Sequence, residues 1–260
     1  MATAGIYTPV DMGSIKKKLQ DVTAVSKTKR LIWKPVVGEQ GSVIRIVPYK
    51  HGPDPFNILF FHYELGTNSA LCAATFGKPC PLCEFADTLR ANKSKEGYAA
   101  FKKISSKRRV YIPIIVRGKE EEGVKFWGVS KTVYERLLTL YNDPEYGDMS
   151  HPTEGTDITV QYTGPDSKMI FGKTEIFPKR NKSRLFEDNQ KIVAVLNSVP
   201  NIYEIYPEQS YSDLQKALDT YLKPKAEEGQ ESSNSFSAGD TLPDTSVDDQ
   251  FDELFSTKTK

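Results

Sequence analysis

Three cysteines and one histidine lie between positions 62 and 83, and the chain has no other cysteine. They are His62, Cys72, Cys80 and Cys83. The two-residue spacing of Cys80 and Cys83 lets two thiolates bind one tetrahedral metal ion from a tight turn, and Cys72 and His62 can supply the third and fourth ligands. Such a set suits Zn²⁺ and leaves no open position for water. The pattern therefore predicts one structural zinc ion and no chemistry at the metal.

The histidine ligand has to be chosen among His51, His62 and His151. His62 is favoured because it ends a predicted strand shortly before Cys72, whereas His51 precedes that strand and His151 lies far away in the sequence. The odd number of cysteines argues against a disulfide framework. Reduced thiols bound to a metal are typical of an intracellular compartment.

Two runs of basic residues each lie beside aromatic residues. The first run holds Lys102, Lys103, Lys107, Arg108 and Arg109 next to Tyr98, Phe101 and Tyr111; the second holds Lys179, Arg180, Lys182 and Arg184 next to Phe171 and Phe177. Trp127 is followed closely by Lys131. Most basic runs are solvated charge, and most single aromatics belong to a core. The repeated pairing favours a groove for single-stranded nucleic acid, because cations neutralise phosphates while aromatic faces stack bases.

The charge is divided unevenly along the chain, although the net charge is only +1. Residues 225–260 hold nine acids and three bases, so this segment carries −6, while residues 1–224 carry +7. The composition of 225–260 is typical of a disordered acidic tail. Phe251, Leu254 and Phe255 are spaced along it as candidate anchors for docking other proteins, and the tail is a candidate competitor for the basic groove.

Motifs that would indicate an enzyme or a membrane protein are missing from the sequence. It has no phosphate-binding loop, dinucleotide-binding turn or nucleophile elbow, and the cysteines are assigned to the metal. It also has no long apolar run and no basic-then-apolar signal peptide. We therefore expect neither catalysis nor a membrane span.

Periodicity predicts a mixed β fold with helices. Strands are predicted over 42–49, 56–65, 110–117, 124–129, 157–162 and 169–177, and helices over 8–22, 83–91, 131–141, 190–197 and 212–222. Short strands with interspersed helices favour a small, partly open, five-stranded barrel of the oligonucleotide-binding (OB-fold) type. We expect an N-terminal helical arm over 1–30, a core over 31–224 and the tail over 225–260.

At these residues the chain resembles the single-stranded DNA-binding (helix-destabilising) protein of T-even-like tailed phages. The similar segments are Val43–Pro48, the histidine and cysteines in the same order with Cys80-Pro81-Leu82-Cys83, the stretch 98–116, and Val129–Leu137. The acidic tail occupies the corresponding place. Together these motifs cover most of the chain.

The resemblance implies an OB-fold core with an inserted zinc subdomain at about 62–95. It also implies cooperative coating of single-stranded DNA during phage DNA replication, recombination and repair, in the cytoplasm of the infected bacterial host. Partners would be copies of the chain and phage replication and recombination proteins bound through the tail. One departure is that Met1–Val10 has no base, whereas the family's arm carries a basic run there; Lys16–Lys18 or Ser26–Arg30 are possible substitutes.

Position by position, the resemblance adds candidate DNA contacts to those of the basic runs. The full predicted set is Arg45, Phe76, Tyr98, Phe101, Lys102, Lys103, Lys107, Arg108, Arg109, Tyr111, Trp127, Lys131, Phe177, Lys179 and Arg180. Two alternative functions stay open on the residues alone. One is an RNA-binding module, and the other is a zinc-ribbon accessory subunit of a nucleic-acid enzyme.

Overall fold

The computed structural model describes residues 11–13, 15–16, 30–63, 65, 69–165 and 172–222. The N-terminal arm and the acidic tail predicted above lie almost wholly outside these ranges, as does Phe171. Among the described residues, none of the helices combines the length and the apolar character needed to cross a membrane.

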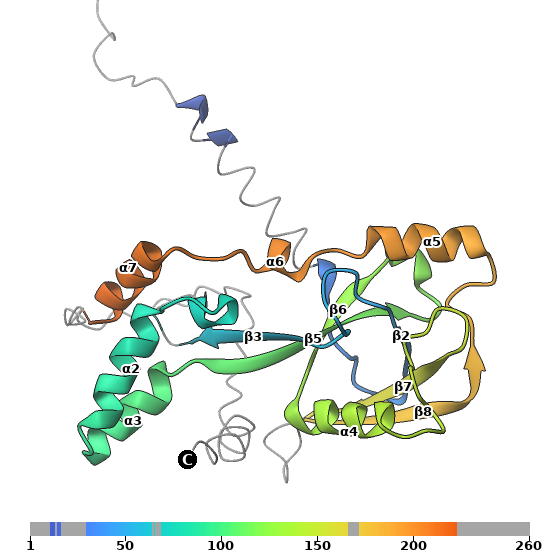
Figure 1. Cartoon of the computed structure of the whole chain (residues 1–260), viewed down its shortest axis with the longest axis horizontal. Coiled ribbons are helices and arrows are strands. Elements are labelled where there is room, and N and C mark those ends of the chain that lie inside the picture. The colour runs from blue at the N-terminus through green and yellow to red at the C-terminus, as the bar shows by residue number, and fades with distance from the viewer. Residues whose placement is uncertain are drawn as a thin grey trace, which may run out of the picture.

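One end of the molecule, here called the sheet lobe, is built on a twisted mixed sheet (Figure 1). Its strands are β1 (Ile32–Trp33), β2 (Gly38–Ile46), β5 (Lys107–Val116), β6 (Lys125–Val129), β7 (Gly155–Thr163) and β8 (Lys173–Ser183). They are hydrogen-bonded in the order β1-β6-β5-β2-β7-β8. The short helix η2 (Glu120–Glu122) joins β5 to β6, and α4 (Lys131–Tyr141) and α5 (Asn189–Ser198) pack on the sheet lobe.

The other end, here called the metal lobe, contains β4 (Ala70–Leu71), η1 (Ala73–Phe76), α2 (Pro81–Ala91), α3 (Lys95–Ile104) and α7 (Tyr211–Leu222). The two lobes are joined by a two-stranded ribbon, made of β3 (Asn57–His62) and the first half of β5. The second half of β5 pairs with β2 and β6 in the sheet lobe. The continuous strand β5 therefore links the metal lobe to the main sheet.

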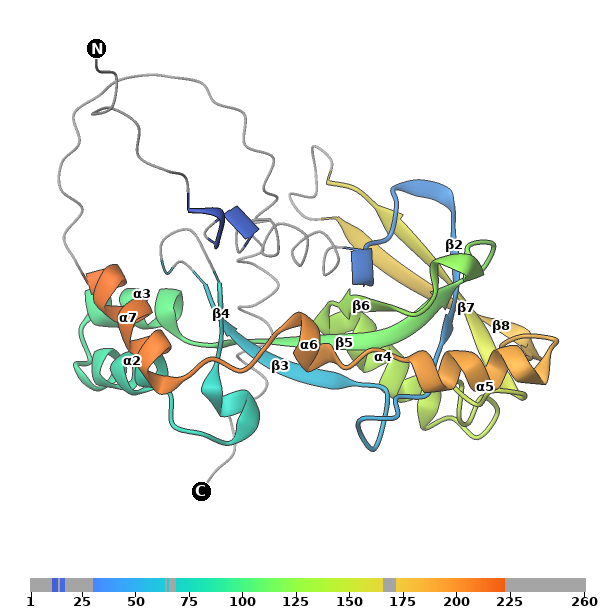
Figure 2. The same cartoon turned by 90° about the horizontal axis from the view of Figure 1, so that it is seen from above.

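A third connection runs along the ribbon from α5 to α7 (Figures 1 and 2). Residues 199–210, here called the strap, contain the short helix α6 (Ile202–Ile205). Figure 2 shows the strap crossing in front of β3 and β5, whereas α4 lies behind them. The strap and α4 are thus on opposite faces of the ribbon.

Three buried clusters follow this division. One fills the sheet lobe beneath α4, around Ile44, Ile112 and Leu137. The second joins the sheet and ribbon to the strap, with Phe61, Val199 and Ile202. The third fills the metal lobe, where Cys72, Cys80 and Leu82 pack against Leu214 and Leu218 of α7.

The expected mixed β fold with helices is confirmed, but the sheet is larger than the five strands expected. In the described part of the chain it has eight strands, and the hydrogen-bonded path does not return from β8 to β1. The strands that the sequence did not predict are β1 and β4; β3 lies within the strand predicted over 56–65, and it pairs with β4 and β5 beside the main path. The helix α3 was missed, so Tyr98 to Lys103 lie on a helix.

Candidate metal centre and nucleic-acid interface

Strand pairing brings the first two metal-type ligands together. His62 is the last residue of β3, and it pairs with Ala70 of β4, so the chain turns back to place Cys72 beside it. The Cys72 backbone N–H donates to the Phe60 carbonyl at 2.8 Å. Both side chains are fully buried.

The other two ligands come from the start of α2. Gly77, with a left-handed φ of 67°, ends η1 and turns the chain towards Cys80. Cys80 is the N-cap of α2 and Pro81 is its first residue, a position that suits proline because its missing N–H has no helical partner. Cys83 lies in the first turn, where the helix dipole favours a thiolate.

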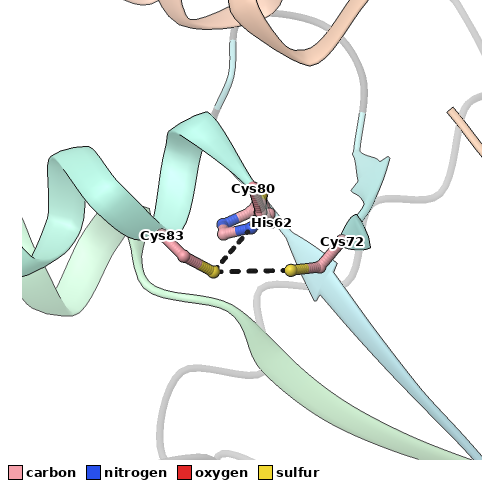
Figure 3. A group of neighbouring side chains, drawn as sticks. All are labelled: His62, Cys72, Cys80 and Cys83. Atoms are coloured by element: carbon pink, nitrogen blue, oxygen red, sulfur yellow. Dashed lines mark hydrogen bonds between the residues drawn. The ribbon is translucent and has the colours of Figure 1, made fainter. Parts of the chain in front are cut away.

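The four ligand atoms converge on one point (Figure 3). All lie within 4.8 Å of one another. The sulfurs of Cys72 and Cys83 are 3.4 Å apart, and His62 Nε2 is 3.4 Å from Cys80 Sγ and 3.6 Å from Cys83 Sγ. A tetrahedral zinc ion with ordinary bond lengths separates its sulfur ligands by about 3.8 Å and sulfur from nitrogen by about 3.6 Å. The four residues therefore fit a metal ion with little movement.

The His62 ring is also held at the nitrogen that faces away from the cysteines. Its Nδ1 lies 2.7 Å from the carbonyl oxygen of Ile104, at the end of α3, and donates a hydrogen bond to it when Nε2 is the ligand. The bond selects the tautomer whose Nε2 lone pair points at the three sulfurs. The carbonyl of α3 thus takes part in holding the metal site.

The charge balance of the cluster favours a cation. Burial opposes a charge on His62, but hydrogen bonds with Cys72 and Cys80 outweigh burial and raise the pKa of His62 to about 9. Hydrogen bonds from Cys72 and Cys83 lower the pKa of Cys80. A metal ion would replace the protons shared by these groups, so metal binding should weaken as the pH falls.

The predicted DNA contacts are divided by the structure into three groups. The first group is exposed: Tyr98, Lys102 and Lys103 on α3, and Phe177, Lys179 and Arg180 on β8. On α3 the Tyr98 and Phe101 rings stack with centroids 6.0 Å apart, Lys102 lies over Tyr98, and Arg90 lies over Phe101. Arg90, on α2, was missed because it lies outside the basic runs.

The second group lies on the ribbon and is split between its two faces. In β3 and β5 the pairs Phe61–Lys107 and Leu59–Arg109 alternate with Phe60–Arg108, and successive side chains of a strand point to opposite faces. Arg108 lies 5.8 Å above the Tyr134 ring of α4. Arg109 lies on the strap side, where its Nε donates to the Tyr63 hydroxyl at 3.1 Å. Tyr134 is a neighbour that the sequence pattern did not single out.

Two aromatic members of the set pack against the strap. The Tyr111 ring lies 5.3 Å from that of Tyr206, and the Phe76 ring lies 5.0 Å from that of Tyr203. Burial and then the neighbouring Tyr206 raise the pKa of Tyr111 well above its usual range. Its hydroxyl therefore keeps its proton and its 3.1 Å hydrogen bond to Tyr206.

The third group, Arg45, Trp127 and Lys131, is buried, so in this structure these side chains offer little surface for the DNA contact predicted for them. Arg45 is completely buried and bonds Asp157, Ser183 and the His151 carbonyl. Trp127 is 2% exposed and packs edge-on against Trp33, and Lys131 is 7% exposed at the start of α4. Residue type and order in the sequence do not reveal which face of a strand is covered.

The structure combines a buried set of candidate metal ligands with exposed cations and aromatic rings, an arrangement compatible with a DNA-binding protein that carries a structural metal. The chain belongs to the family described as gp32 DNA binding protein like, whose sequence profile matches residues 38–222. That span contains the four candidate metal ligands, the ribbon, the strap and α7. No curated protein matches the chain. Membership of this family supports the binding of single-stranded DNA.

Proposed function

We propose that this protein binds single-stranded DNA without sequence preference and holds one structural Zn²⁺ at His62, Cys72, Cys80 and Cys83. The observation that carries the proposal is the family match, which covers both lobes and the ribbon between them. The metal would supply a fixed crosslink between β3, the loop after β4 and α2. The protein's own side chains would do the binding.

Two exposed groups of side chains, here called stations, are available to bind a DNA strand. The metal-lobe station is Tyr98, Phe101 and Lys102 with Arg90, and the sheet-lobe station is Phe177, Lys179 and Arg180. Each combines a partly or largely exposed aromatic ring with cations, which suits stacking of unpaired bases and neutralisation of phosphates. Tyr98 is 53% exposed and Phe177 is 47% exposed, so both rings are accessible to bases.

Between the stations, the DNA strand would cross the ribbon on the face that carries Arg108 and Tyr134, opposite the strap. The opposite face is covered near Tyr111 and Phe61 by Tyr206 of the strap. Phe76, Lys107, Arg109 and Tyr111 are accordingly left out of the proposed path. The sheet lobe would correspond to the partly open OB-fold barrel that the resemblance implies.

The biological setting follows the resemblance. The protein would coat single strands cooperatively, through contacts with its own copies, during phage DNA replication, recombination and repair in the cytoplasm of the infected host. The tail, with Phe251, Leu254 and Phe255, would recruit phage replication and recombination proteins. A strong preference for single strands would melt duplex DNA by mass action.

The test is an anisotropy titration of labelled oligo(dT), the matched duplex and the matched RNA, over a series of salt concentrations, with zinc measured in the same preparation. We expect tight binding of oligo(dT), weak binding of the duplex, and a logarithmic salt slope that grows by about 0.7 for each phosphate contact. Equal affinity for duplex and single strand, or an affinity insensitive to salt, would overturn the proposal. A preference for RNA would support the alternative of an RNA-binding module.

A further inference from the structure

In the described part of the chain few elements connect the two lobes, and these elements must fix the orientation of one lobe relative to the other. In the described part of the chain, β3 and β5 pair with each other over the ribbon, and the strap is the remaining connection between the lobes (Figures 1 and 2). A ribbon of two strands is marginally stable by itself and twists easily. A third element along the ribbon would stiffen it.

The strap is fixed to the sheet lobe at its first residues. The Tyr49 hydroxyl accepts the Ile202 N–H at 3.1 Å and lies 3.3 Å from the Asn201 side-chain oxygen. His51 Nε2 bonds the Val199 carbonyl at 3.1 Å. Val199 and Ile202 are themselves buried, with exposed fractions of 1% and 0%.

The middle of the strap packs on the ribbon. The Tyr206 ring lies 5.0 Å from Phe61 of β3 and 5.3 Å from Tyr111 of β5, so one side chain contacts both strands. The Tyr206 and Tyr111 hydroxyls are 3.1 Å apart. Bending the ribbon would separate these rings.

The far end of the strap is fixed on both sides of the cysteine pair. Glu208 forms an ion pair with Lys78 at 2.5 Å, just before Cys80, and the Tyr211 hydroxyl donates to Glu84, just after Cys83, at 2.9 Å. Leu214 and Leu218 of α7 then enter the same buried cluster as the cysteines. The strap therefore ends in the core of the metal lobe.

We propose that the strap is a brace that holds the two lobes at a fixed angle, so that the two DNA stations act as one site. The inference rests on the proposed function, because it assumes that one strand contacts both lobes. When two stations are held in register, binding at the second follows binding at the first at a high effective concentration. A loose ribbon would lose this advantage without changing either station.

The test compares a short and a long oligo(dT), of about 5 and about 16 nucleotides, which span the range of known site sizes. The double variant Tyr49→Phe and Tyr206→Phe removes two hydroxyls and keeps both rings. We expect it to bind the long oligonucleotide about tenfold more weakly, a loss typical of two hydrogen bonds. The short oligonucleotide should bind within about twofold of the unmodified protein.

A matched control and a second strap variant test whether the effect comes from the strap. Thr139→Val removes a hydroxyl on α4 that donates to the Glu135 carbonyl, and it should leave both affinities unchanged. Glu208→Gln alters only an exposed ion pair at the far end of the strap, so it should weaken the long oligonucleotide alone, by about twofold. Zinc content should stay the same in every variant.

Hydrogen exchange reports on the brace independently of DNA. In the double variant, amides of the ribbon and of residues 199–210 should exchange faster, while those of β7 should not change. Unchanged exchange, equal weakening of both oligonucleotides, or full affinity for the long one would each overturn the brace. If the unmodified protein shows no preference for single strands, the proposed function fails, and the exchange rates alone decide whether the strap braces the lobes.

Discussion

At the scale of single residues, His62 has the most defined role. It is fully buried, its Nδ1 is fixed by the Ile104 carbonyl, and its Nε2 faces Cys80 and Cys83. A ring whose position is fixed at both nitrogens suits a metal ligand, because its orientation is set before the metal binds. Cys83, the least buried of the four, lies in the first turn of α2.

We predict that His62→Ala lowers the zinc content and the melting temperature sharply, whereas His62→Cys keeps one zinc per chain. Structural zinc contributes on the order of 10 kcal/mol to the folding of small domains, so losing a ligand should unfold the metal lobe. Zinc assay and thermal melting measure both effects. Full zinc content in His62→Ala would remove His62 from the ligand set.

Arg45 is a predicted phosphate contact by residue type, but in the structure it forms an ion pair inside the core. Together with Arg117 it shares Asp157, at 3.1 and 2.9 Å, inside the sheet lobe. Burial, despite the neighbouring Asp157, lowers the pKa of Arg45. Gly155 is needed here, because a Cβ at this position would lie 2.4 Å from the Arg45 guanidinium.

We predict opposite signatures for Arg45→Ala and Lys179→Ala. Removing Arg45 breaks a buried ion pair and should destabilise the fold by about 3–5 kcal/mol without changing the salt slope of DNA binding. Removing the exposed Lys179 should leave stability unchanged and reduce the slope by about 0.7. Denaturant melts and salt titrations of the two variants provide the comparison, and a reduced slope for Arg45→Ala would return that residue to the contact set.

At the scale of elements, the alternation of β5 divides its basic start. Arg108 and Arg109 are neighbours in sequence, yet Arg108 faces Tyr134 and Arg109 faces Tyr63. A run of cations on a strand serves two faces of the sheet, whereas the same run on a helix or loop could serve one. The strand register therefore decides which of the two cations lies on the face of the proposed DNA path.

We predict that Arg108→Ala reduces the salt slope of oligo(dT) binding by about 0.7, while Arg109→Ala leaves the slope unchanged. The Arg109 variant should instead loosen the strap face, because its Nε bonds the Tyr63 hydroxyl. Salt titrations and hydrogen exchange separate these effects. The reverse result, with the slope following Arg109, would move the proposed path to the strap face.

At the scale of the whole molecule, charge is divided between a basic core and an acidic tail. The segment after residue 224 carries −6 and the remainder carries +7. An acidic segment joined to a basic core can compete with nucleic acid for the same cations. The stretch from Val247 to Phe255 also carries the three candidate anchors for partner proteins.

We predict that truncation after Pro224 preserves or raises the affinity for oligo(dT), most clearly at low salt, where the competing charge is least screened. It should leave zinc content and melting temperature unchanged, since the metal lobe is completed by α7, which ends at Leu222. Binding isotherms of the two proteins at low and moderate salt measure the effect. A large loss of affinity after truncation would reject the tail as a competitor.

The sequence by itself determined the candidate metal ligands, the basic runs, the acidic composition after residue 224 and the mixed β fold with helices. Ligand type and spacing are local properties, and the helix Lys131–Tyr141 follows from its own periodicity. The motifs that carry the family resemblance are also short and local, so they too can be recognised without the structure.

Only the tertiary structure decided which of these side chains are available. Burial of Arg45 and Trp127, the separation of Arg108 from Arg109, and the packing of Tyr206 on the ribbon depend on contacts between segments far apart in sequence. A charged or aromatic residue has the same identity in a core and on a surface. Its role is set by the elements that cover it, and long-range packing alone chooses them.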